Sequence, residues 1–384
     1  MDKTYDVIVI GAGSVGAPIS FFLSKEKIRV LTIDARASVG QGSNKTAIGG
    51  IRATHSDFSK ITLCKRSIEI FSNWKEQYGD EIEWYQGGYA FPVYENEDET
   101  NMKSLLTKQK DFGLNIEWLG KKYLLEIIPD LNPISLLGGT YSPFDGSASP
   151  LLTAHAFFSQ AKRNGANYLF DTKVHNFQMK SGIINSVITN RGIFHAPLII
   201  NAAGAWAGMI GKMAGVNLPI NPDSHEAGIT EPVTRFLHPM VVDVRPFQKS
   251  ANFYFYQHIT GQIIFCVTPR PNIWGFDTNE TSEFLPLAAR RLIEIMPRLR
   301  NIRVRRTWRG LYPMTPDGLP IVGFSSESDN LLMAIGMCGQ GFMLGPGVGE
   351  LISRIVLGIL NEGDRKILQL LSPKRNFDSP EMLK

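Results

Sequence analysis

Three glycines near the start of the chain have the spacing of a phosphate-binding turn. Gly11, Gly13 and Gly16 form the pattern GxGxxG directly after the apolar run YDVIVI. In such a turn the first glycine permits a tight bend, the second lets a pyrophosphate approach the backbone, and the third packs the next helix against the strand. Asp34 ends the following apolar run, eighteen residues after Gly16, where its carboxylate can accept hydrogen bonds from a ribose. These residues predict a dinucleotide site, for either NAD or FAD.

A second glycine cluster lies near the other end of the chain, in MCGQGFMLGPGVGE (residues 337–350). Five of these fourteen residues are glycines, and each costs backbone entropy relative to alanine. A cluster this dense indicates that another group comes very close to the main chain. The stretch LISRIVLGIL that follows has the character of a helix.

Composition and charge limit the classes of function. With 384 residues the chain has room for a large core and two domains. Lys and Arg exceed Asp and Glu only by 40 to 36, and the one local concentration is RLRNIRVRR, residues 298–306. A solvated face or a subunit contact is the ordinary explanation of such a run, so we expect no nucleic-acid partner.

The cysteines and the apolar segments bear on the compartment. Cys64, Cys266 and Cys338 lie far apart and outside any CxxC pattern, which favours a reduced compartment and argues against disulfide or zinc chemistry. No HExxH motif or ligand-spaced cluster is present, so we expect no metal site.

The glycine spacing in VIVIGAGSVGAPISFFL argues against a signal peptide. No other segment approaches ~18 uninterrupted apolar residues. We therefore expect a cytoplasmic protein without a transmembrane segment.

Hydrophobic periodicity indicates two interleaved domains. Residues 5–34 have the pattern of a βαβ unit, and residues 56–79 that of an amphipathic helix closed by Gly79. Aromatic alternation within residues 216–307 is typical of an antiparallel sheet. The predicted fold class is α/β, with a Rossmann-like nucleotide-binding domain interleaved with an α+β substrate domain that carries a mainly antiparallel sheet. The predicted bounds are 1–80, 142–215 and 308–384 for the former and 81–141 and 216–307 for the latter.

Several motifs, in this chain order, resemble the D-amino acid oxidase superfamily of flavoproteins. They are the loop VGQGSNKTAIGGIRATH (39–55), NAAGAW (201–206), TPDGLPIVG (315–323) and the glycine cluster. The resemblance covers nearly the whole chain and points to the branch of the sarcosine oxidases and the archaeal proline dehydrogenase β subunits. It implies FAD as the cofactor. It also implies that the glycine cluster runs past the edge of the isoalloxazine ring into a helix whose N-terminus stabilises the reduced ring.

The same resemblance implies a set of residues that contact FAD. They are Gly11, Gly13, Ser14, Val15, Gly16, Asp34, Ala35, Arg36, Ser43, Gly50, Ile51, Val174, Ala203, Gly204, Trp206, Gly310, Gly339, Gly341, Phe342 and Met343.

Arg52 and Tyr312 are the expected residues of the catalytic cavity. By the resemblance, Arg52 in GGIRATH is a cation above the flavin that binds the carboxylate of an amino acid, and a guanidinium suits that role because its two parallel N–H groups match two carboxylate oxygens. An internal salt bridge or a contact with the flavin phosphate is the alternative for Arg52. Tyr312 matches a tyrosine that lines the same cavity; the alternative is a half-buried aromatic without a catalytic part.

The chain also departs from the family pattern. Met343 stands where the sarcosine oxidases carry a lysine, so one partner for the carboxylate is lost. Gly310 and Pro150 stand at the two positions of covalent flavin attachment, which predicts noncovalent FAD. A lysine that helps the monomeric oxidases react with oxygen is replaced around Phe265 or Cys266, which weakens the case for an oxidase.

The sequence thus predicts an FAD-dependent oxidoreductase that oxidises the C–N bond of a sarcosine-, proline- or glycine-like amino acid, or of an amine, to an imine by hydride transfer. His225 could face the cavity, but a lone histidine is more often structural than a base. Two alternatives stay open: a flavin-carrying β subunit that relays electrons to a partner in a heteromeric amine or opine dehydrogenase, and an NAD-linked dehydrogenase.

Overall fold

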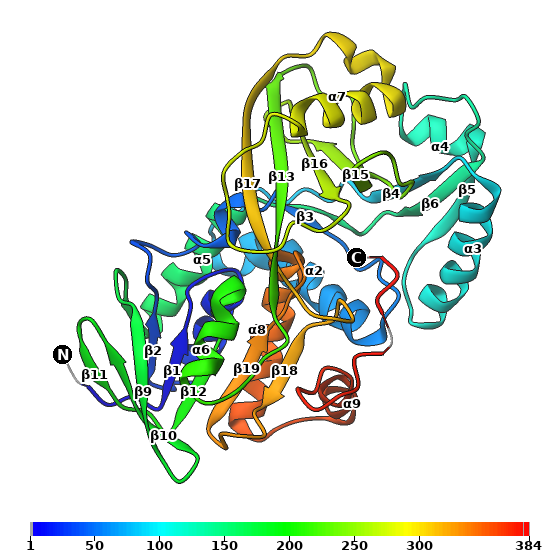
Figure 1. The fold of residues 1–384 in the computed structure, drawn as a ribbon. Coiled ribbons are helices and arrows are strands. Elements are labelled where there is room, and N and C mark those ends of the chain that lie inside the picture. The colour runs from blue at the N-terminus through cyan, green and yellow to red at the C-terminus, as the bar shows by residue number, and fades with distance from the viewer. Residues whose placement is uncertain (1–2, 379, 384) are drawn as a thin grey trace.

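The computed structural model describes residues 3–378 and 380–383, which form two lobes, each built on one large sheet (Figure 1). One lobe contains a six-stranded sheet in the order β18-β19-β12-β1-β2-β8, and the other an eight-stranded sheet in the order β17-β13-β16-β15-β14-β4-β6-β5. Each sheet is assembled from segments far apart in the sequence. This arrangement confirms the predicted fold class of two interleaved α/β and α+β parts.

The six-stranded sheet begins with the predicted βαβ unit. All four residues of the first strand are buried, and it pairs in parallel with its neighbours on both sides, as its continuous apolar sequence predicts. Only the edge pair of β18 with β19 is antiparallel. The strands are β1 (Val7–Ile10), β2 (Val30–Ile33), β8 (Asn167–Leu169), β12 (Leu198–Asn201), β18 (Ile321–Phe324) and β19 (Leu331–Ile335).

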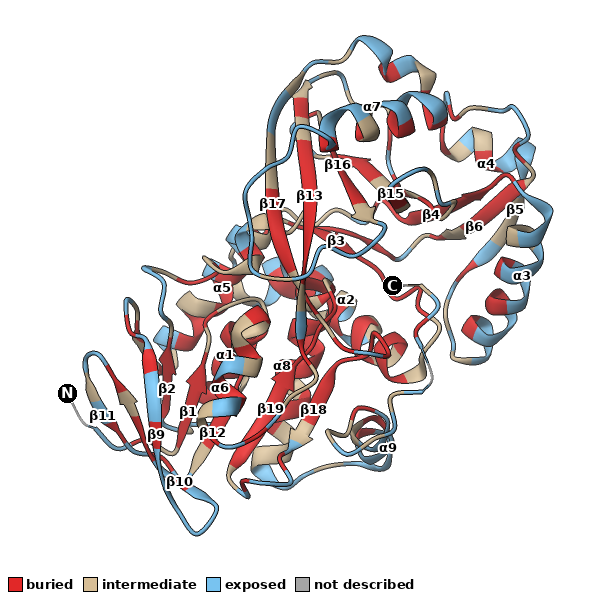
Figure 2. Cartoon of the chain, viewed as in Figure 1, coloured by how far each residue is buried: buried red, intermediate tan, exposed pale blue. Residues whose placement is uncertain are grey.

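Helices pack against one face of this sheet, where side chains of α1, α2, α5 and α8 form a continuous buried core (Figure 2). A short helix, α6, and a three-stranded sheet cover the other face. The predicted amphipathic helix is α2, which begins after Asp57, whose carboxylate accepts from the N–H groups of Ser59 and Lys60, and ends at Gly79 with φ +78°. The elements are α1 (Gly16–Lys25), α2 (Phe58–Tyr78), α5 (Pro150–Arg163), α6 (Ala207–Met213), α8 (Gly341–Leu357), β9 (Val174–Lys180), β10 (Ile183–Thr189) and β11 (Gly192–Phe194).

The eight-stranded sheet is antiparallel except where β14 pairs with β4. Side chains of α4 and α7 cover one of its faces, and the opposite face presents Tyr89, Phe91 and Met240 toward the other lobe. The strands are β4 (Tyr89–Val93), β5 (Glu117–Gly120), β6 (Gly138–Ser142), β13 (Asn221–Pro232), β14 (Met240–Asp243), β15 (Ser250–Gln257), β16 (Gln262–Pro269) and β17 (Val304–Met314), with the helices α3 (Asn96–Asp111), α4 (Lys121–Ile127) and α7 (Phe284–Ile295). The predicted domain boundary at residue 308 falls inside β17, which belongs to this sheet throughout.

The remaining elements connect the lobes or lie at the surface. They are the two-stranded pair β3 (Gly50–Ile51) and β7 (Gly146–Ser147), the helix α9 (Glu362–Leu370), and the 3-10 turns η1 (Ser43–Thr46), η2 (Gly204–Trp206) and η3 (Pro297–Asn301). Within the described residues, no single helix is long and apolar enough to cross a membrane. The helices α8 and α9 are together long and apolar enough, but the chain bends by 111° between them.

Candidate cofactor and substrate site

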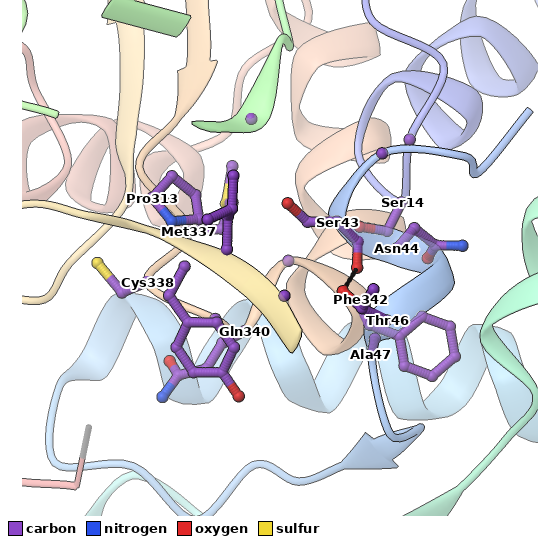
Figure 3. A pocket seen from close by; sticks show the side chains of 18 of the residues that line it. Ser14, Ser43, Asn44, Thr46, Ala47, Pro313, Met337, Cys338, Gln340 and Phe342 are labelled. Atoms are coloured by element: carbon purple, nitrogen blue, oxygen red, sulfur yellow. Dashed lines mark hydrogen bonds between the residues drawn. The ribbon is translucent and has the colours of Figure 1, made fainter. Parts of the chain in front are cut away.

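One large cavity lies where the two lobes meet, with a volume of about 970 Å³. Its walls combine the carboxyl ends of β1 and β2, the loop after β2, the start of α8 and the inward face of the eight-stranded sheet. Figure 3 shows Ser14, Ser43 and Asn44 on one side of this cavity and Pro313, Met337 and Cys338 on the other. A single cavity therefore receives both the predicted dinucleotide residues and the predicted substrate residues.

The three glycines of the first motif have different steric surroundings. Gly11 has φ +108°, and a Cβ on it would overlap the carbonyl oxygen of Ala202. A Cβ on Gly16 would overlap the carbonyl oxygen of Gly11, so this glycine sets the packing of α1 on the strand. A Cβ on Gly13 would meet no atom within 4 Å. The open space beside Gly13, at the start of a helix without a side-chain cap, fits a pyrophosphate.

Asp34 lies directly after β2 and lines the cavity, as predicted. Its Oδ2 accepts from the backbone N–H of Ala12 at 2.7 Å, and its Oδ1 accepts from the N–H of Arg36 at 2.8 Å. Burial raises the pKa of its carboxyl above the ordinary value. The Arg36 guanidinium lies 5.4 Å from the ring centre of Trp206, and both residues line the same part of the cavity. Asp34 thus holds the glycine turn together while its carboxylate faces the space in which a ribose would lie.

The structure corrects the expectation that the second glycine cluster as a whole lies beside the cofactor. Gly339 and Gly341 line the cavity, but Gly345, Gly347 and Gly349 lie inside α8 and do not. A Cβ on Gly345 would overlap the backbone of Ser14, and Cβ atoms on the other two would overlap Leu63 and Pro18. These three glycines let α8 pack closely on α1 and α2. Only the first part of the cluster is placed to contact a cofactor.

Arg52 lines the cavity and is buried, with 7% of its surface exposed. Its Nη1 donates to the carbonyl of Thr54 and lies 3.2 Å from Nδ1 of His55, and its Nη2 donates to the carbonyl of Leu383 at 2.8 Å. Within the described residues Arg52 makes no ion pair with a carboxylate. The two other buried arginines, Arg291 and Arg309, pair with carboxylates at 3.0 and 3.3 Å.

Asp145 is the buried carboxyl group near Arg52, and its hydrogen bonds go elsewhere. Its Oδ1 accepts from the N–H of Ala53 at 2.9 Å and its Oδ2 from the hydroxyl of Thr54 at 3.3 Å. Burial raises the pKa of Asp145 to about 7. A carboxyl with this pKa is partly protonated near pH 7, and within the described residues it forms no ion pair with Arg52.

Tyr312 lies on β17 and lines the cavity beside Gly339. Its hydroxyl is 2.6 Å from that of Tyr254 on β15, and its ring stacks on His225 with the centres 3.7 Å apart. His225 also lines the cavity and its Nε2 lies 3.1 Å from the carboxylate of Asp223. Burial raises the pKa of Tyr312 and lowers that of His225, so both side chains are neutral near pH 7.

The structure brings the predicted residues to the cavity with two exceptions. Gly16 packs α1 as described above, and Ile51 is fully buried in β3, away from the cavity lining. Ile51 faces the core because alternate residues of a strand face opposite sides, and its neighbours Gly50 and Arg52 take the cavity side, so its contact with FAD stays a prediction. The predicted residues that line the cavity are Gly11, Gly13, Ser14, Val15, Asp34, Ala35, Arg36, Ser43, Gly50, Arg52, Val174, Ala203, Gly204, Trp206, Gly310, Tyr312, Gly339, Gly341, Phe342 and Met343.

Of the positions where the chain departs from the family, Gly310, Met343 and Cys266 face the cavity, whereas Phe265 packs in the core on the far face of the sheet. Pro150 begins α5 and is not part of the lining. Sequence reasoning missed Tyr254, Gln340, Met382 and Leu383, which also line the cavity. The aromatic alternation in NFYFYQ could have pointed to Tyr254, but nothing in the local pattern marks the last two.

Comparison with known proteins identifies the class. Residues 6–355 match the family of FAD dependent oxidoreductases (DAO), and the chain belongs to this family. It is an enzyme of the oxidoreductase class, and its cofactor is FAD rather than NAD. The open space at Gly13 and the cavity-facing glycines just before and at the start of α8, Gly339 and Gly341, fit that group.

Individual relatives cover nearly the whole chain. The crystal structure of L-proline dehydrogenase from P. horikoshii is 32% identical, with a TM-score of 0.90 and 98% of both chains covered. That of glycine oxidase from Geobacillus kaustophilus is 25% identical, with a TM-score of 0.87 and coverage of 98% of this chain and 100% of that one. The hydrogen cyanide synthase subunit HcnC from Pseudomonas aeruginosa is 25% identical, with 93% of each covered.

Proposed function

We propose that the chain oxidises the C–N bond of an amino acid or N-substituted amino acid to an imine, with noncovalently bound FAD. When bound, FAD accepts the hydride from the α-carbon. The names of the similar proteins, glycine oxidase and L-proline dehydrogenase, support a substrate of this class.

The observation that carries the proposal is the state of Arg52. It is a buried cation at the cavity wall whose hydrogen bonds, among the described residues, go to neutral groups. A buried charge is costly unless it is paired, so a substrate carboxylate that supplies the missing negative charge binds with a gain. This favours carboxylate binding over the alternative of an internal salt bridge.

Other residues of the cavity wall can donate hydrogen bonds to the substrate and exclude water from it. Tyr312 and Tyr254 offer hydroxyl groups to the substrate from the face of the eight-stranded sheet, and Met343 leaves that part of the wall apolar. Apolar walls exclude water, which strengthens the attraction between Arg52 and a carboxylate.

An anaerobic panel of amino acids, N-methyl amino acids and amines without a carboxylate tests the proposal. We expect loss of the yellow flavin colour with a carboxylate-bearing amine and not with the matched amine that lacks the carboxylate. Reduction only by amines without a carboxylate would show that the proposed substrate class is wrong.

A second arrangement is that the chain is the flavin-carrying subunit of a larger complex that passes electrons to a partner. The relative HcnC is itself named as a subunit, which supports this arrangement. Copurification of a second chain from a native extract, with faster dye reduction in the complex than in the isolated chain, is the result expected for such a subunit.

A further inference from the structure

The last described residues of the chain form part of the cavity wall. Residues 380–383, here called the C-terminal segment, lie between the two lobes close to α2 (Figure 1). Met382 and Leu383 line the cavity, and Leu383 packs with the aromatic cluster on the inward face of the eight-stranded sheet. The segment thus reaches the site from a position in the sequence that is distant from every predicted motif.

Glu381 anchors this segment. Its Oε1 accepts from the backbone N–H and the hydroxyl of Ser56, at 2.8 and 2.6 Å, and from the N–H of Leu383 at 3.0 Å. Its Oε2 lies 3.5 Å from Nζ of Lys60, and both of these side chains are fully buried. The backbone N–H of Glu381 also donates to the carbonyl of Asp317 at 2.8 Å.

The protonation state of Glu381 agrees with its role as the anchor of the C-terminal segment. Burial raises the pKa of its carboxyl, but Lys60 and the hydrogen bonds from Ser56 outweigh burial and hold the pKa below the ordinary value. The carboxylate is therefore charged near pH 7, and within the described residues its ion-pair partner is Lys60.

The anchored segment makes a direct contact with Arg52. The carbonyl of Leu383 accepts from Nη2 of Arg52 at 2.8 Å, and Nε2 of Gln340 lies 3.5 Å from the same oxygen. The opposite nitrogen of the guanidinium is held by Thr54, in the loop that carries Arg52 itself. A carbonyl orients a guanidinium without neutralising its charge, so the positive charge stays available to a ligand.

We propose that Glu381 is a positioning residue for Arg52: by anchoring residues 380–383 to Ser56 and Lys60, it places the Leu383 carbonyl on the guanidinium and fixes the direction in which Arg52 meets the substrate carboxylate. This inference rests on the proposed function, in which Arg52 binds that carboxylate. It adds the C-terminal segment to the substrate site.

The test uses the full-length holoenzyme with Glu381→Gln, a substitution that keeps the shape of the side chain and removes its charge. Binding of sodium acetate is followed by the visible spectrum of the flavin, and KM and kcat are measured for the amino acid that reduces the wild-type flavin best. We expect the acetate Kd and the KM to rise about tenfold, with kcat changing less than threefold, because one charge-assisted hydrogen bond at Arg52 is misdirected. A variant with unchanged acetate Kd and unchanged KM would overturn the inference.

Two further variants separate positioning from stability. Asp364→Asn removes another buried carboxylate near the C-terminus. Asp364 is not part of the cavity lining, and its carboxylate pairs with Arg354 at a distance of 2.7 Å. It should lower the melting temperature without changing the acetate Kd. If Glu381→Gln does not fold because it leaves Lys60 unpaired, the double variant Lys60→Met with Glu381→Met removes both charges and takes its place, with the same expected rise in Kd.

A double-mutant cycle with Arg52→Ala shows whether the effect passes through Arg52. In the Arg52→Ala background, Glu381→Gln should leave the acetate Kd and the KM unchanged, since the group that it positions is gone. An equal effect in both backgrounds would show that Glu381 does not act through Arg52. If no amino acid reduces the wild-type flavin at all, the proposed function fails, whereas an unchanged Glu381→Gln in an active enzyme contradicts only the inference.

Discussion

The carboxylate of Asp34 accepts a hydrogen bond from the backbone N–H of Ala12 at 2.7 Å, so the residue that follows β2 is tied directly to the glycine turn that follows β1. This contact makes Asp34 part of the turn, in addition to its predicted role as a partner for the ribose.

We predict that Asp34→Ala weakens FAD retention by roughly 1.5 to 3 kcal/mol, or about tenfold to a hundredfold, which is the value of a charge-assisted hydrogen bond. The measurement is the Kd of FAD for the apoprotein, determined by fluorescence quenching. Asp34→Asn can accept the bond from Ala12 and should recover part of the loss. An unchanged Kd in Asp34→Ala would mean that the ribose binds elsewhere.

The second prediction concerns Arg52. Truncation of one partner of a buried charged pair costs about 2 to 5 kcal/mol, so Arg52→Ala should lower kcat/KM by roughly thirtyfold to several thousandfold. Arg52→Lys should recover only part, because an ammonium group cannot form two parallel hydrogen bonds to one carboxylate. Steady-state kinetics at normal FAD content is the measurement, and wild-type kcat/KM in Arg52→Ala would refute the assignment.

The third prediction is that FAD is not covalently attached. The basis is the absence of a nucleophile at Gly310, where a Cβ would also overlap the side chain of Thr46, and at Pro150. Acid precipitation of the purified protein should leave the yellow colour in the supernatant. A coloured pellet after washing would contradict the prediction.

The fourth prediction is that the reduced enzyme passes electrons to a dye faster than to oxygen. By the resemblance, the monomeric oxidases carry a lysine around the position of Phe265 or Cys266, and a fixed positive charge there would stabilise the developing charge on oxygen. In this chain Cys266 faces the cavity, and its thiol stays neutral because burial raises its pKa. Stopped-flow reoxidation in air-saturated buffer gives the rate. A rate equal to substrate turnover would show that the enzyme is an oxidase.

The fifth prediction concerns stability and pH at Asp145. Its folded pKa of about 7 lies above the ordinary value of 3.8, so the folded state binds the proton more tightly than the unfolded chain. Its contribution to stability is therefore complete below about pH 4 and is lost as the pH rises through 7. Asp145→Asn, which cannot ionise, should gain in melting temperature relative to the wild type between pH 5 and pH 8. A difference between the two proteins that does not change with pH would argue against the raised pKa.

The predicted site residues that spacing alone brings to the cavity are those that depend on local geometry. The turn from Gly11 to Gly16 sits between a strand and a helix that follow each other directly, and Asp34 ends the next strand, so spacing alone places all of them. Arg52 and Tyr312 were placed by resemblance to a family, and the structure brings both to the cavity.

The parts that the sequence does not predict depend on contacts between distant segments. A glycine needed for cofactor approach and one needed for helix packing have the same sequence signal, and only the positions of α1 and α2 show that Gly345 and Gly347 serve packing. In the same way, Leu383 contacts Arg52 across 331 residues, and no local pattern marks it.

The strands β13 and β17 are paired without a gap from Asn221 opposite Met314 to Gly228 opposite Thr307, and they run from the cavity into the upper part of the eight-stranded sheet (Figure 1). The backbone hydrogen bonds between them, each worth about 1 kcal/mol, resist any change in this register. His225 on β13 and Tyr312 on β17 therefore keep their stacked arrangement at the cavity wall for as long as this ladder stays paired.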